Sequence, residues 1–252
     1  MGHHILLLGG TTEARALAEH LAPRSDLMVT LSLAGRTLKP AALPVPMRVG
    51  GFGGAEGLEA WLRQHRIAAL LDATHPYAAR ISTNAHRAAR RAGVPLLALG
   101  RPAWVPEAGD DWRPVPDVAA ACVALGAIPR RVFLALGRQE VAGFAATTQH
   151  RYLIRSVDPI IPLPPMPDVT CLTARGPFTL AEEAALLDAH RIEAIVCKNS
   201  GGTASFAKLV AARARRLPVF MLARPASPDA PHCTTVEEAL AWLGHALSRR
   251  EV

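Results

Sequence analysis

Short apolar runs alternate with amphipathic, helix-like stretches along most of the chain, and this alternation limits the possible folds more than any other feature. The apolar runs have the length of strands, and the stretches between them repeat their apolar residues at helical spacing. Neighbouring parallel strands need a crossover connection, which is usually a helix. The alternation therefore predicts an α/β fold built on parallel sheets.

A proline-rich stretch at residues 101–116 separates two such alternating halves. Because proline supplies no backbone N–H, we expect irregular chain here and a domain boundary. The prediction is a first domain at 1–103 and a second at 104–252. Strands are expected at 4–8, 27–33, 47–49, 68–72, 95–99, 131–136, 152–157, 169–173, 194–197 and 218–222, and helices at 12–21, 55–64, 81–92, 117–125, 139–146, 179–190, 203–216 and 236–247.

Composition excludes several classes of protein. Half of the residues are apolar and 19% are charged, which supplies a core and excludes a disordered chain. No apolar run approaches the roughly 18 residues that span a bilayer, so no membrane contact is expected. The first apolar run ends at Gly9, too soon for a signal peptide, and we expect a cytoplasmic protein. The 4 cysteines and 10 histidines lack metal-ligand spacing, so no metal is predicted and the cysteines are expected to be buried.

The net charge of +7 favours an anionic partner. The basic residues are dispersed rather than clustered, and only 5% of the residues are aromatic, so platforms for stacking bases are scarce. We therefore expect no nucleic acid and favour an anionic small molecule.

The first candidate site is the turn that joins the first expected strand to the first helix. Glycines at such a turn let the backbone approach a phosphate, and the helix N-terminus offers free N–H groups. Against the dinucleotide fingerprint GxGxxG only Gly9 matches, and a capped helix after a tight turn is the plainer alternative. The residues assigned to a cofactor here are Gly9, Gly10, Thr11, Thr12 and Glu13.

Two further segments of the first half extend this candidate cofactor site. The second strand ends without the acidic residue that would bind a ribose hydroxyl in an NAD enzyme, and Ser32 and Arg36 could instead hold the 2′-phosphate of NADPH. Gly51 and Gly53 lie in a glycine run after the third strand, where the backbone could pass close to the adenosine. A solvent-exposed arginine and a surface loop are the alternatives.

The segment DATHPYA follows the fourth strand and is the most specific signal of the first half. Ligands of open α/β sheets bind at the carboxyl ends of the strands, so Asp72, His75 and Tyr77 are expected to face the site. An imidazole and a phenol are suitable proton donors, and these three residues are the candidate catalytic groups. The alternative is that Asp72 and His75 only fix the turn.

In the second half, two basic loops follow strands in the same way. Arg138 comes after the strand at 131–136, and KNSGG comes after the strand at 194–197. A cation beside a strand–turn–helix junction suits an anion. Arg138, Lys198, Asn199, Ser200 and Gly201 are therefore the candidate substrate-binding residues, with a solvated loop as the alternative.

Together these segments resemble the precorrin-6A reductase family of cobalamin biosynthesis. The resemblance rests on ILLLGGTTEARALAEHL, DATHPYAARISTNA, LALGRQE and KNSGG with the AKLVAARARRLPVFMLARP that follows, and it covers residues 5–225. It implies two Rossmann-like domains, with the cofactor held mainly by the first and the substrate in a cleft between them. It also implies NAD(P)H-dependent reduction of one C=C bond of a polycarboxylate tetrapyrrole, precorrin-6A, to give precorrin-6B.

The assignment of Arg36 favours NADPH and the metal-free branch of the pathway. The alternatives are an NADH-dependent cobalt-precorrin-6A reductase, a reductase of a smaller substrate and a non-catalytic NADP-binding module. The oligomeric state and the proton donor are left open.

Overall fold

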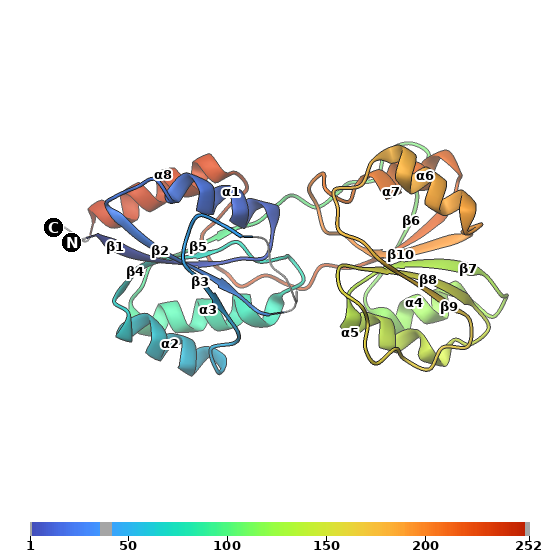
Figure 1. The fold of residues 1–252 in the computed structure, drawn as a ribbon, viewed down its shortest axis with the longest axis horizontal. Coiled ribbons are helices and arrows are strands. Elements are labelled where there is room, and N and C mark those ends of the chain that lie inside the picture. The colour runs from blue at the N-terminus through green and yellow to red at the C-terminus, as the bar shows by residue number, and fades with distance from the viewer. Residues whose placement is uncertain (1, 36–41, 250–252) are drawn as a thin grey trace. The chain divides into compact units, whose positions relative to one another are not determined.

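The computed structural model describes residues 2–35 and 42–249 and divides the chain into two compact units. The first unit consists of Met1–Pro102 together with Pro225–Val252, and the second consists of Ala103–Arg224. Each unit holds one sheet of six parallel strands with helices on both faces (Figure 1). The predicted α/β class is thus confirmed, and the cleft expected between the domains stays a prediction.

The sheet of the first unit has the strand order β12-β5-β4-β1-β2-β3. Its strands are β1 (His3–Leu8), β2 (Leu27–Leu33), β3 (Met47–Val49), β4 (Ile67–Asp72), β5 (Leu96–Leu99) and β12 (His232–Cys233). Helices α1 (Thr12–Leu21) and α8 (Val236–Ser248) cover one face, and α2 (Gly54–Gln64) and α3 (Ala79–Ala92) cover the other (Figure 1). Read from β3, this is the order of a dinucleotide-binding sheet.

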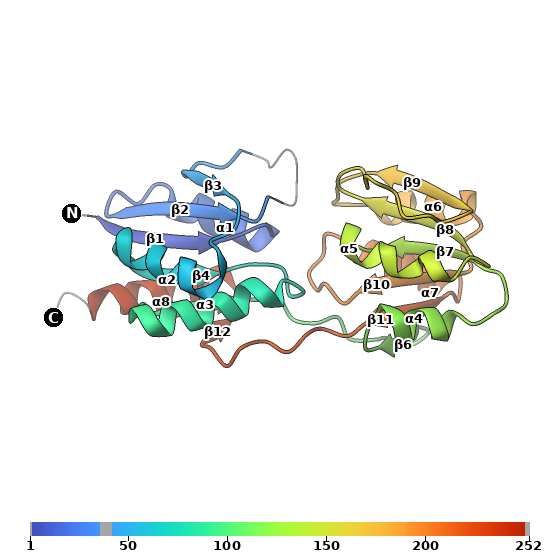
Figure 2. The same ribbon diagram turned by 90° about the horizontal axis from the view of Figure 1, so that it is seen from below.

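The sheet of the second unit has the order β6-β11-β10-β7-β8-β9. Its strands are β6 (Asp111–Val115), β7 (Arg131–Ala135), β8 (Arg151–Ser156), β9 (Val169–Thr173), β10 (Ala194–Lys198) and β11 (Pro218–Leu222). Helices α6 (Leu180–Ala189) and α7 (Ala207–Ala214) cover one face, and α4 (Val118–Leu125), α5 (Arg138–Val141) and the 3-10 turn η1 (Ala142–Ala146) cover the other. Figure 2 shows the strands of each sheet lying side by side in the order given.

Buried central strands hold each unit together. All six residues of β4 are buried, as expected for a strand covered on both faces. On one side of the first sheet, Leu7 and Leu17 pack with Leu243 of α8, and on the other side Leu6 packs with Leu58 of α2. The apolar runs of the sequence are therefore strands whose two faces are both buried against helices.

In each sheet, one edge strand is supplied by the segment that follows the last central strand of the other unit along the chain. β6 follows β5 along the chain but pairs with β11, whereas β12 follows β11 but pairs with β5. The expected domain at 104–252 is therefore wrong at its C-terminal end, because residues 225–252 complete the first unit. The exposed edge of β5 needs a partner, and the apolar face of α1 needs α8.

Both of these strands lie in segments without an expected strand. Pro114 is tolerated in β6 because the strand forms an edge of its sheet. Most other expected elements match to within a few residues, although 139–146 splits into α5 and η1. The expectation of buried cysteines is confirmed for Cys197, whereas Cys122 and Cys233 are half-buried and Cys171 is exposed. In the described ranges no helix is both long and apolar enough to cross a membrane.

Replacing Leu243 by alanine tests whether the C-terminal segment 225–252 belongs to the first unit. Leu243 is fully buried in the core of the first unit, so the variant should lose about 2–5 kcal/mol of unfolding free energy. Hydrogen exchange read by mass spectrometry should accelerate in peptides from residues 2–102 and not in those from 103–224. Leu180→Ala, at a side chain that is 49% exposed, is the matched control. Faster exchange confined to 103–224 would contradict the division.

Candidate functional site

The strand order of the first sheet reverses between β1 and β4, so the loops after these two strands lead to helices on opposite faces. Ligands of open α/β sheets bind at such a switch point. Leu8 pairs in register with Ser32 of β2 and with Asp72 of β4. The ends of three neighbouring strands, each followed by predicted site residues, therefore lie side by side.

The turn between β1 and α1 is shaped by its glycines. A Cβ on Gly9 would lie 2.5 Å from Leu31 Cδ1 and 3.2 Å from Ala14 Cβ, so a larger residue here would have to displace the buried side chain of Leu31. Gly10 has φ +120°, and a Cβ there would meet nothing within 4 Å. The side chain of Thr11 accepts from the Ala14 N–H at 3.1 Å and donates to the Ala73 carbonyl at 2.7 Å. The turn is open on its outer side, where a phosphate group would fit against the helix N-terminus.

Glu13 adds an acidic group to this turn. Its carboxylate accepts from the Thr12 hydroxyl at 3.1 Å and lies 3.3 Å from Nη2 of Arg101. A carboxylate in the first turn stabilises a helix, but it would repel an approaching diphosphate. Arg101, which sequence reasoning did not single out, offsets that charge.

The segment after β4 is held by a network that begins at Asp72. Its Oδ1 accepts from the backbone N–H of Thr74 at 3.1 Å and from the hydroxyl of the same residue at 2.7 Å. That hydroxyl lies 3.2 Å from Oγ of Ser82. Asp72 is only 6% exposed, and it does fix the turn, as the plainer alternative requires.

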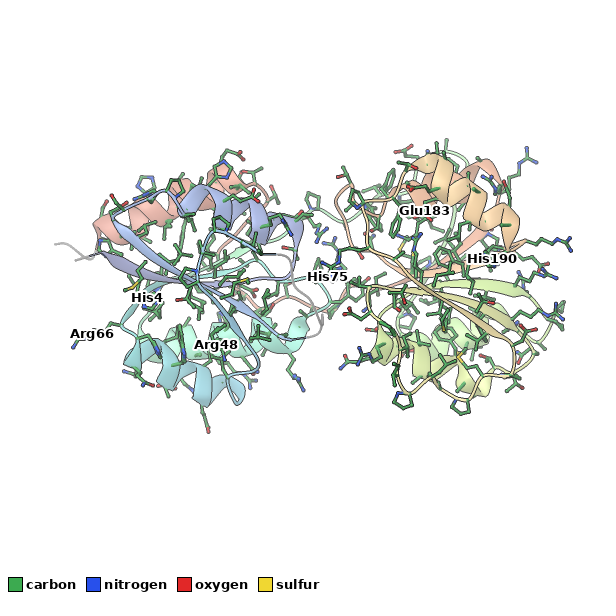
Figure 3. The ribbon with its side chains drawn as sticks, in the orientation of Figure 1. His4, Arg48, Arg66, His75, Glu183 and His190 are labelled. Carbon is green, nitrogen blue, oxygen red and sulfur yellow. The ribbon has the colours of Figure 1, made fainter. Side chains whose placement is uncertain are left out.

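His75, labelled in Figure 3, and Tyr77 follow on the same turn. Nδ1 of His75 accepts from the backbone N–H of Tyr77 at 3.2 Å, which leaves the ring hydrogen on Nε2. The two rings are tilted, with centroids 5.7 Å apart. Two groups that can give a proton thus stand together after the central strand.

The end of β2 has a contact that the sequence did not predict. The Ser32 hydroxyl accepts from Nη1 of Arg48, a residue that sequence reasoning missed. Gly51 lies in the loop between β3 and α2, where its carbonyl accepts from Arg48, and Gly53 is the N-cap of α2 with φ +81°. Arg36 lies outside the described residues.

In the second unit, the switch point between β7 and β10 carries an ion pair. The ammonium of Lys198, the last residue of β10, donates to Glu140 of α5, the helix that follows β7. A Cβ on Gly137 would lie 2.8 Å from Oε2 of Glu140, so this turn is filled where its counterpart in the first unit is open. Arg138 is exposed at the start of α5. Ser200 and Gly201 follow Lys198, and Gly201 has φ +69°.

Asn199 has structural partners. Its Oδ1 accepts from the backbone N–H of Trp104 at 2.8 Å, and its Nδ2 donates to the carbonyl of the same residue at 2.9 Å. The indole N–H of Trp104 donates to the Gly202 carbonyl at 2.7 Å. The KNSGG loop is thereby tied to the segment that enters the second unit, and the amide of Asn199 is used on that contact.

Arg155, at the end of β8, is also engaged internally. Its guanidinium makes two hydrogen bonds, at 2.7 and 3.0 Å, to Glu183 of α6, which is fully buried (labelled in Figure 3). The ring of Phe178 lies 3.7 Å from the Arg155 guanidinium carbon. This cation supports the fold of the second unit.

Comparison with known proteins identifies the family. The model of the precorrin-6x reductases CbiJ/CobK matches residues 4–244. The chain belongs to this family. It is 51% identical to a precorrin-6A reductase from Sinorhizobium over 97% of the chain and 94% of the relative, and 43% identical to one from Mycobacterium tuberculosis over 97% and 99%. A solved CobK precorrin-6A reductase has 46% identity and a TM-score of 0.92, covering 97% of each chain.

A cobalt-precorrin-6A reductase from Salmonella typhimurium is more distant, at 28% identity over 88% of the chain and 87% of the relative. Membership of a reductase family, together with the Rossmann-like sheet, indicates a nicotinamide cofactor. The resemblance seen in the sequence is thus confirmed at the level of the family.

The predicted residues gather in two places. In the first unit the loops after β1 and β4 are joined by Thr11, and Ser32 ends the neighbouring strand. In the second unit the end of β10 and the helix α5 that follows β7 are joined by the ion pair between Lys198 and Glu140. Three further functional candidates come from the structure: Arg48, Arg101 and Glu140. In the sequence, their one distinguishing feature is a charge close to a glycine turn.

Glu183→Gln should destabilise the second unit, because it leaves the buried guanidinium of Arg155 without a counter-charge. Removing one partner of a buried ion pair costs about 3–5 kcal/mol, which urea unfolding would measure. Glu182→Gln is the matched control, since Glu182 is exposed and a glutamine can still close its capping box with Thr179. Equal losses in the two variants would show that the Arg155–Glu183 pair contributes nothing specific.

Proposed function

We propose that this chain is an NADPH-dependent precorrin-6A reductase of cobalamin biosynthesis, which reduces one C=C bond of the macrocycle to give precorrin-6B. The observation that carries the proposal is the switch point of the first sheet. An open glycine turn and a helix N-terminus lie there beside the loop that bears His75 and Tyr77. The names of the relatives supply the substrate, and the geometry supports a place for cofactor and proton donor.

The first unit fits a dinucleotide. The turn at Gly9 and Gly10 leaves room for a diphosphate, and Thr11 and Thr12 begin the helix whose N–H groups would bind it. Arg101 offsets the charge of Glu13 beside that position. When bound, the reduced nicotinamide supplies the hydride, and the protein supplies binding, orientation and the proton.

Reduction of the double bond breaks one π bond and forms two C–H bonds, so a proton must reach one carbon when hydride reaches the other. The candidates in this chain are the phenol of Tyr77 and the imidazolium form of His75, in which Nδ1 carries a hydrogen and no longer accepts from the Tyr77 N–H. Asp72 fixes the turn on which both stand. Bound water and the substrate's own carboxylates are the other possible sources.

The second unit offers cations for the substrate. A tetrapyrrole with several carboxylates needs cations, and Lys198 and Arg138 follow the central strands of the second sheet. Ser200 and Gly201 add a hydroxyl and a turn with positive φ next to Lys198. We assign these four residues to substrate binding, with Asn199 holding the loop in place.

The metal-free branch and NADPH are favoured over cobalt-precorrin and NADH. Relatives named precorrin-6A reductase share 43–51% identity with the chain, against 26–28% for those named cobalt-precorrin-6A reductase. The end of β2 carries Ser32 rather than an acidic residue, which disfavours a free ribose hydroxyl. Arg36 was assigned to the same 2′-phosphate from the sequence. We expect a protein of the cytoplasm.

The purified protein should oxidise NADPH, followed at 340 nm, only when enzymatically prepared precorrin-6A is present. NADH should be the poorer reductant at equal concentration. Tetrapyrrole-dependent oxidation that is faster with NADH would overturn the cofactor assignment. Tight NADPH binding without turnover would favour a non-catalytic NADP-binding module.

Lys198→Gln should raise KM for precorrin-6A about 10-fold or more, because a charge-assisted contact to a carboxylate is lost. The dissociation constant for NADPH, measured separately by fluorescence, should not change. Arg151→Gln is the control. It removes a cation at the amino ends of the strands of the same sheet, where Arg151 begins β8 and pairs with Asp168. A KM unchanged by Lys198→Gln would remove Lys198 from the substrate site.

A further inference from the structure

Arg48 lies at the carboxyl end of the first sheet and has no carboxylate partner among the described residues. It pairs in register with Ser32, which pairs with Leu8 at the end of β1. Its side chain is partly buried, and this desolvation lowers the pKa of its guanidinium. Within residues 2–35 and 42–249 no carboxylate forms an ion pair with it. A partly buried charge of this kind favours binding of an anion.

The contacts that Arg48 does make leave one side of its guanidinium open. Nη1 donates to the Ser32 hydroxyl at 2.7 Å and to the Gly50 carbonyl at 3.1 Å, and Nη2 donates to the Gly51 carbonyl at 3.0 Å. The guanidinium carbon lies 3.8 Å from the centre of the Phe52 ring. These contacts fix the plane of the group and use three of its five N–H donors.

Other arginines of this chain show which group the unused N–H donors of Arg48 can bind. Arg113, Arg213 and Arg215 each direct Nε and Nη2 at the two oxygens of one carboxylate. In Arg48, the Nε–H and the second Nη2–H have no acceptor among the described residues. This is the pair of donors that matches the oxygens of a carboxylate or a phosphate.

The Ser32 hydroxyl adds a further donor beside this pair. A hydroxyl that accepts from an arginine N–H must donate its own hydrogen elsewhere. No acceptor in the described part of the chain receives it. Arg48 therefore orients Ser32 so that both side chains offer hydrogens to the same outside group.

We propose that Arg48, with Ser32, binds the 2′-phosphate of the cofactor's adenosine ribose and so selects NADPH over NADH. The end of the second strand is where a Rossmann-like sheet recognises the ribose substituent, by an acidic residue for a hydroxyl and by arginine for a phosphate. The inference rests on the proposed function insofar as it takes the ligand to be a nicotinamide dinucleotide. Without the phosphate, the partly buried charge of Arg48 has no anion beside it, which disfavours NADH.

Binding measurements test the proposal without the tetrapyrrole. Isothermal titration would give dissociation constants of NADP⁺ and NAD⁺, and of 2′,5′-ADP and 5′-AMP, for the wild type, Arg48→Met and Arg48→Lys. Arg48→Met should weaken NADP⁺ and 2′,5′-ADP roughly 10- to 100-fold and leave NAD⁺ and 5′-AMP within about 3-fold. Arg48→Lys should fall between, because it keeps the charge and loses the paired donors.

Two controls separate recognition from folding. Arg24→Gln removes a cation just before the opposite end of β2, where Arg24 pairs with Asp26, and should leave all four constants unchanged. Ser32→Ala keeps Arg48 and should weaken only the two ligands with a 2′-phosphate. It provides the test if Arg48→Met disturbs the loop that Arg48 holds through Gly50 and Gly51.

Equal weakening of NADP⁺ and NAD⁺ in all of these variants would overturn the proposal and make Arg48 a purely structural clamp of the glycine loop. A preference for NADP⁺ that survives both Arg48→Met and Ser32→Ala would overturn it as well. Loss of the preference in a protein that fails to reduce precorrin-6A would leave this inference standing while the proposed function falls.

Discussion

The hydrogen-bonding edge of β5 is the constraint on which the first unit depends. A parallel sheet that stopped there would expose unpaired backbone groups beside a buried strand. The residues that pair with this edge come after the whole second unit in the sequence: His232 and Cys233 pair with Ala98 and Leu99. The two residues of β12 contribute little burial themselves. They bring α8 against α1, and that contact completes the core.

The same exchange operates in the other direction. β6 follows β5 along the chain, yet it closes the edge of β11 and carries α4 onto the second sheet. Each unit therefore has the pattern of five strands in order 3-2-1-4-5, plus a sixth strand and helix that follow the fifth strand of the other unit. Two chain crossings, at 102–103 and at 224–225, join the units. One crossing would suffice for a simple tandem repeat, and the second is the consequence of the exchange.

This exchange explains which parts of the fold the sequence could predict. Central strands such as β4 are buried on both faces and appear as apolar runs, so their positions can be predicted from the pattern of apolar residues along the sequence. β6 contains Pro114 and exposed residues, and β12 has two residues, because edge strands need neither length nor apolar character. Even a correct strand assignment would not show which sheet each edge strand joins. That choice depends on which edge is open in three dimensions.

The candidate site divides along a similar line. The loops were predictable because residues after parallel strands must meet at one edge of the sheet, and glycines mark the turns. The partners of individual side chains were not predictable, since they depend on packing between segments distant in sequence. Asn199 thus contacts Trp104, Arg155 contacts Glu183, and Ser32 contacts Arg48.

The two switch points differ in a way that fits a division of labour between the units. They share one topology, but the turn after β1 is open around Gly10, whereas the turn after β7 is occupied by Glu140 and the ammonium of Lys198. A diphosphate can enter the first turn and would meet a carboxylate in the second. The second turn keeps a cation at the end of its central strand instead, which suits a ligand with separate carboxylates. Under the proposed function, one sheet topology thus serves a dinucleotide in one unit and a polycarboxylate in the other, through the side chains placed at two equivalent turns.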